Sequence, residues 1–335
     1  MTNLFIALSN NQVSNSSILA KEMKHDKNIL ITSRKLNFNE AIFSKVICVE
    51  QSFNNQSTGV IKSVRAIIAK IKSYKKIVDR ISYLKNEKDI TIYFSYIEDI
   101  LTNYLLFSFN KNVKGVVVED GTLNYYSHTI NSISKLKIYS KWLLSKWYGI
   151  PFILYKGHSS GIEYDFVKEQ YVRSPEISLF PEKSKQLKFS KRYLDLSQTI
   201  LVVGQEAYIN MYGKEMYLKR LKELIEIITE SDSYSTSKKI YYKPHRHGGR
   251  VENSFISNLF GDKEVVFLDS DAPLEDLYFN QLKSKHIFGF DSSVFLNIYL
   301  ETDEAVRNEI NFNVLLVYNK KMKPIFNRFN FNIFE

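Results

Sequence analysis

The chain alternates between two patterns of hydrophobic and polar residues. Short runs rich in apolar and β-branched residues predict strands, and longer stretches with apolar residues at every third or fourth position predict amphipathic helices. In the first half, the predicted strands are 3–9, 28–33, 45–50, 89–96 and 113–119, and the predicted helices are 16–24, 63–84 and 97–109. This β-α-β order is typical of a parallel sheet that is covered by helices.

The pattern breaks once and then resumes. Residues 173–195 contain two of the six prolines, many charges and no sustained period, so we predict a linker at 176–196. Beyond it, the predicted helix is 213–231 and the predicted strands are 198–205, 238–245, 264–270, 285–293 and 313–319. Strands and a helix therefore follow one another in the second half as well.

These patterns predict an α/β protein with two domains. Two Rossmann-like domains whose parallel sheets face a central cleft form the arrangement called GT-B in nucleotide-sugar glycosyltransferases. The predicted parts are an N-terminal domain at 1–175, the linker at 176–196, a C-terminal domain at 197–320 and a tail at 321–335. We leave open whether the tail packs back on the N-terminal domain.

Composition indicates the cellular compartment in which the protein works. The 335 residues, of which 44% are hydrophobic, are enough for a large core. Cys48 is the one cysteine, so the chain has no internal disulfide and no cysteine-based metal site. The N-terminal apolar run lacks a preceding basic region, and no stretch approaches the roughly 18 apolar residues that span a bilayer. We therefore expect a cytoplasmic protein.

The formal net charge of +10 indicates an anionic partner. Nucleic acid, phospholipid head groups and a nucleotide-bearing substrate all fit that charge. The chain has no Cys/His finger spacing, no aromatic motif of an RNA-recognition domain and no long basic tail. We therefore expect no nucleic-acid partner.

Four predicted strands end in polar clusters, and ligands bind at the carboxyl ends of the strands in open parallel sheets. The clusters are Glu119-Asp120-Gly121, Lys243-Pro244-His245, Ser270-Asp271 and Asp291-Ser292-Ser293. Taken singly, each has a structural interpretation as a helix cap or as a surface group. Their common position at strand ends in a two-domain α/β chain favours a ligand site.

The motifs resemble those of bacterial GT-B sialyltransferases, which include lipooligosaccharide sialyltransferases and polysialyltransferases. That family has a D/E-D/E-G motif in its N-terminal domain, and an HP motif followed by an S-S/T motif in its C-terminal domain. Here EDG stands at 119–121, KPHRH at 243–247 and DSS at 291–293, in the same order. One departure is that the proline precedes His245, which leaves His247 as the alternative histidine.

The resemblance implies an inverting transfer of sialic acid from CMP-sialic acid to a sugar hydroxyl. The N-terminal domain would hold the acceptor, and Asp120 would take the proton of its hydroxyl. Glu119 would shape the environment of Asp120, or exchange roles with it, because neighbouring like charges raise one of the two pKa values. Gly121 would let the chain turn sharply. The alternative for 119–124 is a capped helix start.

The C-terminal domain would hold the CMP moiety. His245 would act as an acid or hydrogen-bond donor to the leaving phosphate, joined by Ser292 and Ser293 at a helix start. Further substrate-binding candidates are Lys243 or Arg246 for charge, Glu275 for the ribose hydroxyls, and Gly204 with Gln205 for the cytidine side. Glu275 also fits a first-turn helix acid that is favoured by the helix dipole.

We predict that no metal or other cofactor is needed. Asp269 and Asp271 form a D-x-D pair of oxygen ligands, which is the one candidate metal site. The resemblance implies a metal-independent reaction in which protein groups neutralise the phosphate. Two other functions stay open: transfer of another CMP-activated acid such as Kdo or a different nonulosonate, and non-catalytic binding of a nucleotide or glycan in polysaccharide assembly.

One basic amphipathic stretch bears on the location of the protein. Residues 134–149 interleave four lysines with both tryptophans of the chain, a composition suited to a membrane interface. Docking on the sheet fits the same stretch equally well. Peripheral attachment to the inner face of the cytoplasmic membrane would suit a lipid-linked glycan acceptor. The terminal acceptor sugar, most often galactose in this family, and the linkage are left open.

Overall fold

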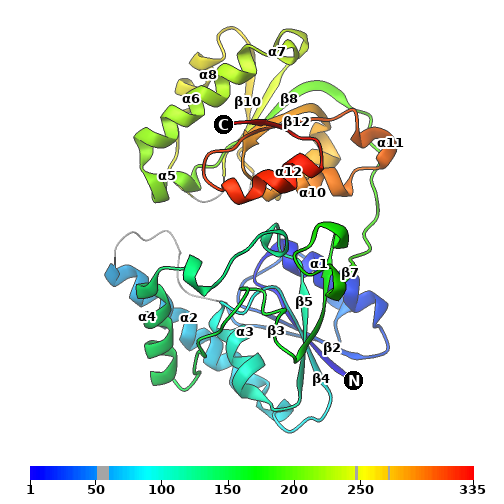
Figure 1. Cartoon of the computed structure of the whole chain (residues 1–335), viewed down its shortest axis with the longest axis vertical. Coiled ribbons are helices and arrows are strands. Elements are labelled where there is room, and N and C mark those ends of the chain that lie inside the picture. The colour runs from blue at the N-terminus through cyan, green and yellow to red at the C-terminus, as the bar shows by residue number, and fades with distance from the viewer. Residues whose placement is uncertain (51–59, 246–247, 271) are drawn as a thin grey trace. The chain divides into compact units, whose positions relative to one another are not determined.

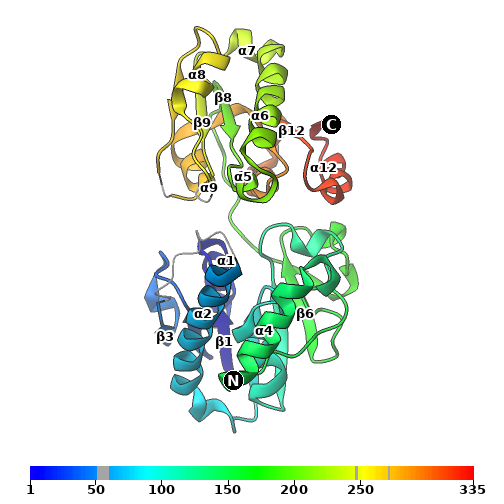
Figure 2. The ribbon, with the colours of Figure 1, turned by 90° about the vertical axis from the view of Figure 1, so that its left-hand side faces the viewer.

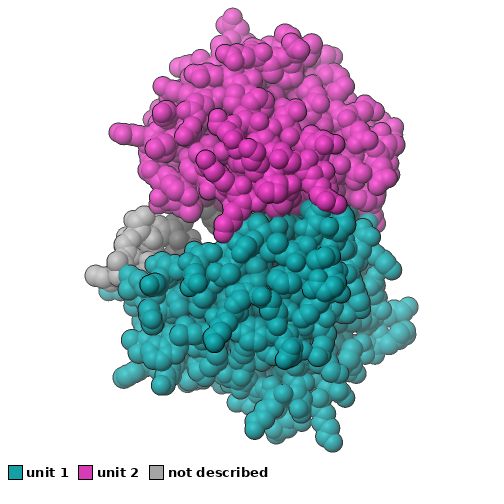
Figure 3. All heavy atoms as spheres, in the orientation of Figure 1, with its two compact units in different colours: residues 1–189 teal, residues 190–335 magenta. Residues whose placement is uncertain are grey.

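A computed structural model describes residues 1–50, 60–245, 248–270 and 272–335, with the side chains of 60–63 left out of the description. The chain forms two compact units, Met1–Phe189 and Ser190–Glu335. Figure 3 colours the two units separately. Each unit contains its own sheet and its own core.

The first unit is built on a seven-stranded parallel sheet with the strand order β3-β2-β1-β4-β5-β6-β7. Its strands are β1 Thr2–Ile6, β2 Lys27–Thr32, β3 Lys45–Cys48, β4 Ile90–Phe94, β5 Val113–Val118, β6 Val167–Val172 and β7 Ser184–Gln186. Every residue of β1 and β4 is buried. Strands that are buried along their whole length form where helices cover both faces of a parallel sheet.

Successive residues of β1 pack into two different cores, because side chains alternate between the faces of a strand. Leu4 and Ile6 lie in the larger core, whereas Phe5, and Ala7 just beyond the strand, lie in the smaller one. The larger core is completed by α2 Val60–Arg80, α3 Ile100–Tyr104 with its continuation Leu105–Phe109, and α4 Lys135–Trp147 packed beside them. The smaller core is completed by α1 Asn10–Glu22. Figures 1 and 2 show these helices around the sheet.

The second unit has a six-stranded parallel sheet with the order β10-β9-β8-β11-β12-β13. Its strands are β8 Ser197–Val203, β9 Ile240–Lys243, β10 Val265–Phe267, β11 Ser284–Phe290, β12 Asn311–Leu315 and β13 Asn332–Phe334. Its helices are α5 Ala207–Tyr212, α6 Lys214–Thr229, α7 Asp232–Thr236, α8 Asn253–Leu259, α9 Leu274–Leu277, α10 Ser293–Glu301, α11 Glu304–Arg307 and α12 Lys323–Arg328. The prediction of two α/β units with parallel sheets is therefore confirmed.

The predicted linker at 176–196 is only partly a connection. Residues up to Phe189 belong to the first unit, and β7 pairs in parallel with β6 as an edge strand. Leu187 is fully buried in the core beside α1. The charges and prolines of this stretch obscured a three-residue strand, which is too short to show a period of two.

The tail at 321–335 is an integral part of the second unit, so the C-terminal domain does not end at residue 320. β13 pairs in parallel with β12. Phe331 stacks on Phe312 with 4.6 Å between ring centroids and on Phe326 with 5.5 Å. Phe295 of α10 contacts the same group of rings. The tail thus closes an aromatic cluster on the face of the sheet opposite α6.

We expect Phe331→Ala to destabilise the second unit by about 3 kcal/mol, because it removes a buried ring and leaves a cavity. Chemical unfolding followed by circular dichroism would measure the loss. Arg328→Ala, at an exposed position of the same segment, is the matched control and should change the stability by less than about 0.5 kcal/mol. Equal stability of the Phe331 variant and the wild type would contradict the role of the tail in the core.

Candidate functional site

The order of the strands defines a switch point in each sheet, where crossover connections leave in opposite directions. In the first unit the chain moves outward from β1 to β2 and β3, and then returns to place β4 on the other side of β1. In the second unit the same reversal lies between β8 and β11. Ligands of open α/β sheets bind outside the carboxyl ends of the strands at such points.

Asp120 follows the carboxyl end of β5 and is partly exposed. Its Oδ2 accepts a hydrogen bond of 2.5 Å from Gln12 Nε2, and its Oδ1 accepts one of 3.4 Å from Asn11 Nδ2. Both donors lie in the first turn of α1, which begins directly after β1. The helix start at the switch point therefore holds the Asp120 carboxylate.

The first turn of α1 is a form of capping box, which accounts for the position of Gln12. Ser9 caps the helix by accepting a hydrogen bond of 3.2 Å from the Gln12 backbone N–H. Gln12 Oε1 in turn accepts a hydrogen bond of 2.6 Å from the Leu8 N–H. That bond orients the amide so that Nε2 points to Asp120. Sequence reasoning missed Gln12, although the Ser-x-x-Gln pattern after the first strand was a usable signal.

Glu119 has a different environment and is completely buried. Its Oε2 accepts hydrogen bonds from the Tyr125 hydroxyl and, at 2.6 Å, from the Arg173 N–H. Arg173 Nε lies 3.8 Å from Glu119 Oε1. Burial raises the pKa of the Glu119 carboxyl above its usual range, although the charge of Arg173 opposes the shift. These contacts suit a carboxylate that shapes the surroundings of Asp120.

The chain turns sharply after these two carboxylates. Gly121 has φ +67°, a conformation that favours glycine, as the sequence predicted. The next regular element is a 3₁₀ turn at Leu123–Tyr125 whose flanking residue Thr122 makes no capping hydrogen bond. The alternative interpretation of 119–124 as a capped helix start is therefore wrong.

Sequence reasoning also missed Tyr96 and Arg173. Tyr96 lies just beyond the carboxyl end of β4, and burial, together with the charges of Asp99 and Asp120, raises its pKa to about 12. Its hydroxyl therefore stays protonated at neutral pH and can donate a hydrogen bond. Arg173 follows β6, and its Nη2 donates to Asn11 Oδ1 at 3.2 Å and to Asn15 Oδ1 at 3.4 Å. Neither residue stands in a recognisable motif.

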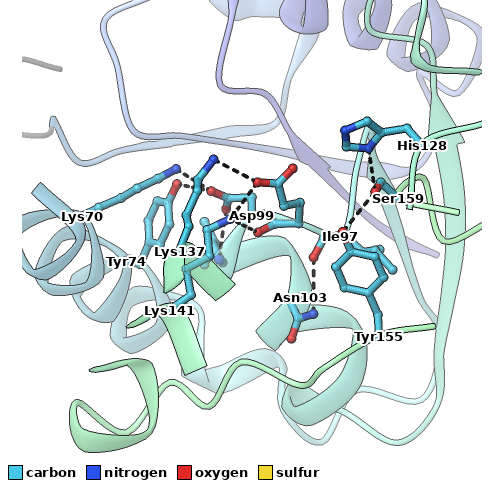
Figure 4. Close-up of polar contacts among 12 residues, drawn as sticks. Lys70, Tyr74, Ile97, Asp99, Asn103, His128, Lys137, Lys141, Tyr155 and Ser159 are labelled. Carbon is cyan, nitrogen blue, oxygen red and sulfur yellow. Dashed lines mark hydrogen bonds and ion pairs between the residues drawn. The ribbon is translucent and has the colours of Figure 1, made fainter. Parts of the chain in front are cut away.

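A second group of polar contacts lies beside β4 (Figure 4). The Ser159 carbonyl accepts a hydrogen bond of 2.9 Å from the Ile97 N–H, and its hydroxyl lies 2.9 Å from His128 Nδ1 and 3.0 Å from the Tyr155 hydroxyl. Buried Asp99 pairs with Lys70 at 2.7 Å. The contacts of Ser159 join the segment after β5 to the end of β4, so that this segment and the end of β4 both border the switch point.

In the second unit, the predicted Gly204 and Gln205 follow the carboxyl end of β8. A Cβ atom on Gly204 would lie 2.7 Å from Glu206 Oε1 and 2.8 Å from the Tyr242 hydroxyl, so a side chain does not fit there. Gln205 is partly exposed, and its N–H donates to the Tyr217 hydroxyl at 3.1 Å. The fold thus explains the glycine by packing against Glu206.

Glu206 is a buried residue that sequence reasoning missed. Its Oε1 accepts a hydrogen bond of 2.6 Å from the Tyr242 hydroxyl, and its Oε2 accepts one of 2.5 Å from the His245 N–H. The bond to His245 joins the loop after β9 to the loop after β8. No local pattern in the sequence marks this role, because both partners are distant along the chain.

The predicted His245 is partly exposed at the carboxyl end of β9. Lys243 is buried, and its Nζ donates a hydrogen bond of 2.6 Å to the Ser270 carbonyl in the loop after β10. Lys243 therefore connects two of the four predicted clusters. Arg246 and His247 lie outside the described residues.

Ser292 and Ser293 start α10 directly after β11 and Asp291. Ser292 is the N-cap, and its hydroxyl accepts a hydrogen bond of 3.4 Å from the Val294 N–H. Burial raises the pKa of Asp291, whose Oδ1 accepts from the Tyr318 N–H at 3.5 Å. The structural interpretation of the serine pair as a cap therefore holds for Ser292, while Ser293 is a partly exposed first-turn residue.

Glu275 lies in the first turn of α9 and is partly exposed. Its Oε1 accepts a hydrogen bond of 2.7 Å from Asn297 Nδ2 of α10. This bond brings Glu275 next to the helix that begins with the serine pair. Of the D-x-D pair, Asp269 is exposed and Asp271 lies outside the described residues. Among the described residues, no group of three or more His, Cys, Asp or Glu side chains is placed to hold a metal ion.

Comparison with known proteins gave structural neighbours and no sequence relative. No protein-family model matches the chain, and no curated protein sequence matches it. A 2,6-sialyltransferase from Vibrionaceae Photobacterium sp. JT-ISH-224, solved with CMP and lactose, is 14% identical at a TM-score of 0.49, over 99% of this chain and 78% of that one.

Two further structural neighbours have somewhat lower TM-scores. MurG of Acinetobacter baumannii is 8% identical at a TM-score of 0.46, and the glycosyltransferase SnogD of Streptomyces nogalater is 11% identical at a TM-score of 0.46. Each match covers 100% of this chain and 86% of the other.

The two adjacent carboxylates should respond differently to substitution. Glu119→Ala would remove a buried carboxylate that pairs with Arg173 and accepts hydrogen bonds from the Tyr125 hydroxyl and the Arg173 N–H, so we expect it to destabilise the first unit by about 3 kcal/mol or more. Asp120→Ala removes a partly exposed group and should change the stability by about 1 kcal/mol or less. Thermal and denaturant unfolding of the full chain would measure both. Equal losses for the two variants would contradict the distinction.

Proposed function

We propose that the protein is an inverting, metal-independent sialyltransferase that uses CMP-sialic acid and a terminal sugar, galactose in the simplest case, of a bacterial surface glycan. The observation that carries the proposal is the common position of its three motifs. EDG, KPH and DSS all follow carboxyl ends of parallel strands, at or beside a switch point. The resemblance of these motifs to those of bacterial sialyltransferases supplies the reaction class.

In this proposal the first unit supplies the base. Asp120 takes the proton of the acceptor hydroxyl, and the hydroxyl oxygen forms a bond to the anomeric carbon of the sialic acid. The bond from that carbon to the CMP phosphate oxygen breaks, and its electron pair leaves with CMP. Gln12 supports this role, because its hydrogen bond of 2.5 Å holds one carboxylate oxygen in place. A fixed base loses less freedom on reaching the transition state.

The second unit holds the nucleotide and stabilises the leaving phosphate. His245 is the proposed acid or hydrogen-bond donor, and the N-terminus of the nine-residue α10 offers backbone N–H groups to an anion. The hydrogen bond from the His245 N–H to Glu206 supports the assignment, because it fixes the backbone that carries the imidazole. Glu275, held by Asn297, is the proposed acceptor for the ribose hydroxyls. Ser293 offers its hydroxyl beside the phosphate, and Lys243 supports the loops.

A cytoplasmic location and a glycan acceptor that is lipid-linked belong to the same proposal. CMP-activated sugars and a cytoplasmic enzyme would meet such an acceptor at the inner face of the membrane. The alternative is a donor that carries Kdo or a nonulosonate other than sialic acid, since the groups proposed here bind the CMP moiety that all these donors share.

The purified full chain should release CMP from CMP-sialic acid when an acceptor such as lactose is present. A panel of CMP-sialic acid, CMP-Kdo and a second CMP-nonulosonate, with UDP-galactose as a negative control, would rank the donors. EDTA should leave the rate unchanged, since protein groups are proposed to neutralise the phosphate. Loss of activity in EDTA would indicate that a metal ion is required, with Asp269 and Asp271 as its candidate ligands. CMP binding without turnover of any donor would instead identify a binding protein.

Substitutions at the two proposed catalytic groups, Asp120 and His245, should affect turnover more than they affect binding. Asp120→Ala should lower turnover by about a hundredfold or more with CMP affinity retained, as expected when a general base is removed. His245→Ala should raise the barrier by roughly 3 kcal/mol, the scale for one preorganised donor to developing charge. Calorimetric titration with CMP and initial rates would measure both effects. His247→Ala is the matched control, and a larger effect there would transfer the role to His247.

A further inference from the structure

Helix α4 presents an apolar stripe to solvent. Leu136, Tyr139, Leu143 and Trp147 are 63%, 60%, 59% and 85% exposed. Spacings of three and four residues place these side chains along one side of the helix. Large apolar side chains normally avoid such exposure when they are contiguous. We call this set the α4 stripe.

The opposite side of α4 is firmly packed, so the direction of the stripe is fixed. Lys141 is almost buried, and its Nζ donates hydrogen bonds of 2.9 Å to both the carbonyl and Oε1 of Glu98. Ser145 Oγ accepts a hydrogen bond of 2.9 Å from the Phe152 N–H. Figure 4 shows Lys141 directed into the unit. Docking on the rest of the unit therefore accounts for the inner side of α4 and leaves the stripe unexplained.

The surface beside the stripe is strongly basic. Helices α2 and α4 contact each other, and Figure 2 shows them on the same side of the first unit. Their sequences contain eleven Lys and Arg residues against one acid, Asp79, which is a net charge of +10. Three of these lysines, Lys70, Lys137 and Lys141, pair with the neighbouring acids Asp99 and Glu98, and the other cations whose side chains the structure describes have no acid of these two helices beside them except Asp79. The formal net charge of the whole chain is also +10, so the rest of the chain is neutral. The exposed cations of α2 include Arg65, Lys72 and Lys76, which share one side of the helix.

We propose that the α4 stripe and the adjoining basic side of α2 bind the surface of a membrane that contains anionic phospholipids. Apolar and aromatic side chains enter the boundary between head groups and acyl chains, while lysines and arginines meet the lipid phosphates. Among the described residues, no helix is both long and apolar enough to cross a bilayer, so this contact lies on the surface.

The combination of features favours a membrane over other anionic partners. A nucleic acid would use the cations and would leave the apolar stripe exposed to water. A second copy of the chain would cover the stripe but would bring two strongly basic surfaces together, which is unfavourable. An anionic lipid surface satisfies both the charge and the apolar side chains. The inference stands apart from the proposed function, because its readouts need no substrate.

The positions of the tryptophans provide a direct readout. Trp142 and Trp147 are the two tryptophans of the chain, and both lie in α4. Addition of vesicles of phosphatidylglycerol and phosphatidylcholine to the full chain should shift tryptophan emission to shorter wavelength. Vesicles of phosphatidylcholine alone should give at least about tenfold weaker partition, and added salt should weaken binding to the anionic vesicles. Equal partition into both vesicles, or no shift, would overturn the proposal.

Variants at exposed positions test the two parts of the surface by vesicle co-sedimentation. Leu143→Ser with Trp147→Ser, and separately Lys72→Glu with Lys76→Glu, should each lower the partition coefficient about tenfold or more while thermal unfolding is unchanged. The matched controls are at exposed positions of the second unit and should bind as the wild type does. They are Tyr193→Ser with Met211→Ser, and Lys219→Glu with Lys238→Glu.

Three outcomes would assign the surface elsewhere and overturn the proposal. One is wild-type partition of the Leu143 and Trp147 double variant. Another is binding to a DNA duplex that is as tight as binding to vesicles and is unaffected by that variant. The third is a concentration-dependent dimer, seen by analytical ultracentrifugation, that the same variant abolishes.

Discussion

The buried ion pair of Glu119 and Arg173 holds the carboxyl end of the first sheet together. Glu119 follows β5 and Arg173 follows β6, so their contact fixes the two strand ends side by side. Arg173 extends the network to Asn11 and Asn15 of α1. A buried charge is costly unless it is paired and hydrogen-bonded, and here both charges are. The position of the α1 start, and with it the Gln12 contact to Asp120, depends on this pair.

The second unit also has a buried glutamate that satisfies hydrogen-bond donors beyond the strand ends. In both units a buried glutamate just beyond a central strand accepts one hydrogen bond from a tyrosine hydroxyl and one from a backbone N–H of the neighbouring loop. In the first unit these donors are Tyr125 and Arg173, and in the second they are Tyr242 and His245. Each loop end in a parallel sheet has N–H groups without strand partners, and a buried carboxylate can satisfy them. Glu206 thus fixes the backbone at His245, as Glu119 fixes the backbone at the end of β6.

This arrangement separates the residues that hold the strand ends from those that could meet a ligand. Glu119 and Glu206 are buried and bonded, whereas Asp120 and His245, their neighbours in sequence or space, are partly exposed. Rigid support by buried partners keeps a reacting group within the narrow geometry that chemistry requires. In the proposed reaction, the base Asp120 and the hydrogen-bond donor to the phosphate, His245, occupy these supported positions. The proposed membrane surface lies on α2 and α4, which contribute none of these residues.

Much of the fold followed from local patterns in the sequence. The apolar runs predicted the central strands of both sheets, and the apolar spacing predicted α2 and α6, because period and composition are properties of neighbouring residues. The same runs predicted the positions of the polar clusters, since a residue that follows a buried parallel strand lies at the carboxyl end of the sheet. Strand β6 was not predicted, because charged and polar residues stand between its buried ones. The short edge strand β7 and the C-terminal β13 were not predicted either, because three residues show no period and their pairing is decided by distant strands.

The distinction between the two carboxylates at 119 and 120 was decided by tertiary structure alone. The sequence by itself determined that two acids and a glycine follow a buried strand. Which acid is buried depends on Arg173 and Gln12, which come from two distant segments of the chain, and on Tyr125 in the turn that follows the acids. Glu206 has the same explanation, because Tyr242 and His245 are contacts across the sheet. A hydrogen bond between residues far apart in the chain leaves no local pattern, so the sequence marks the place of the site and only the fold assigns its members.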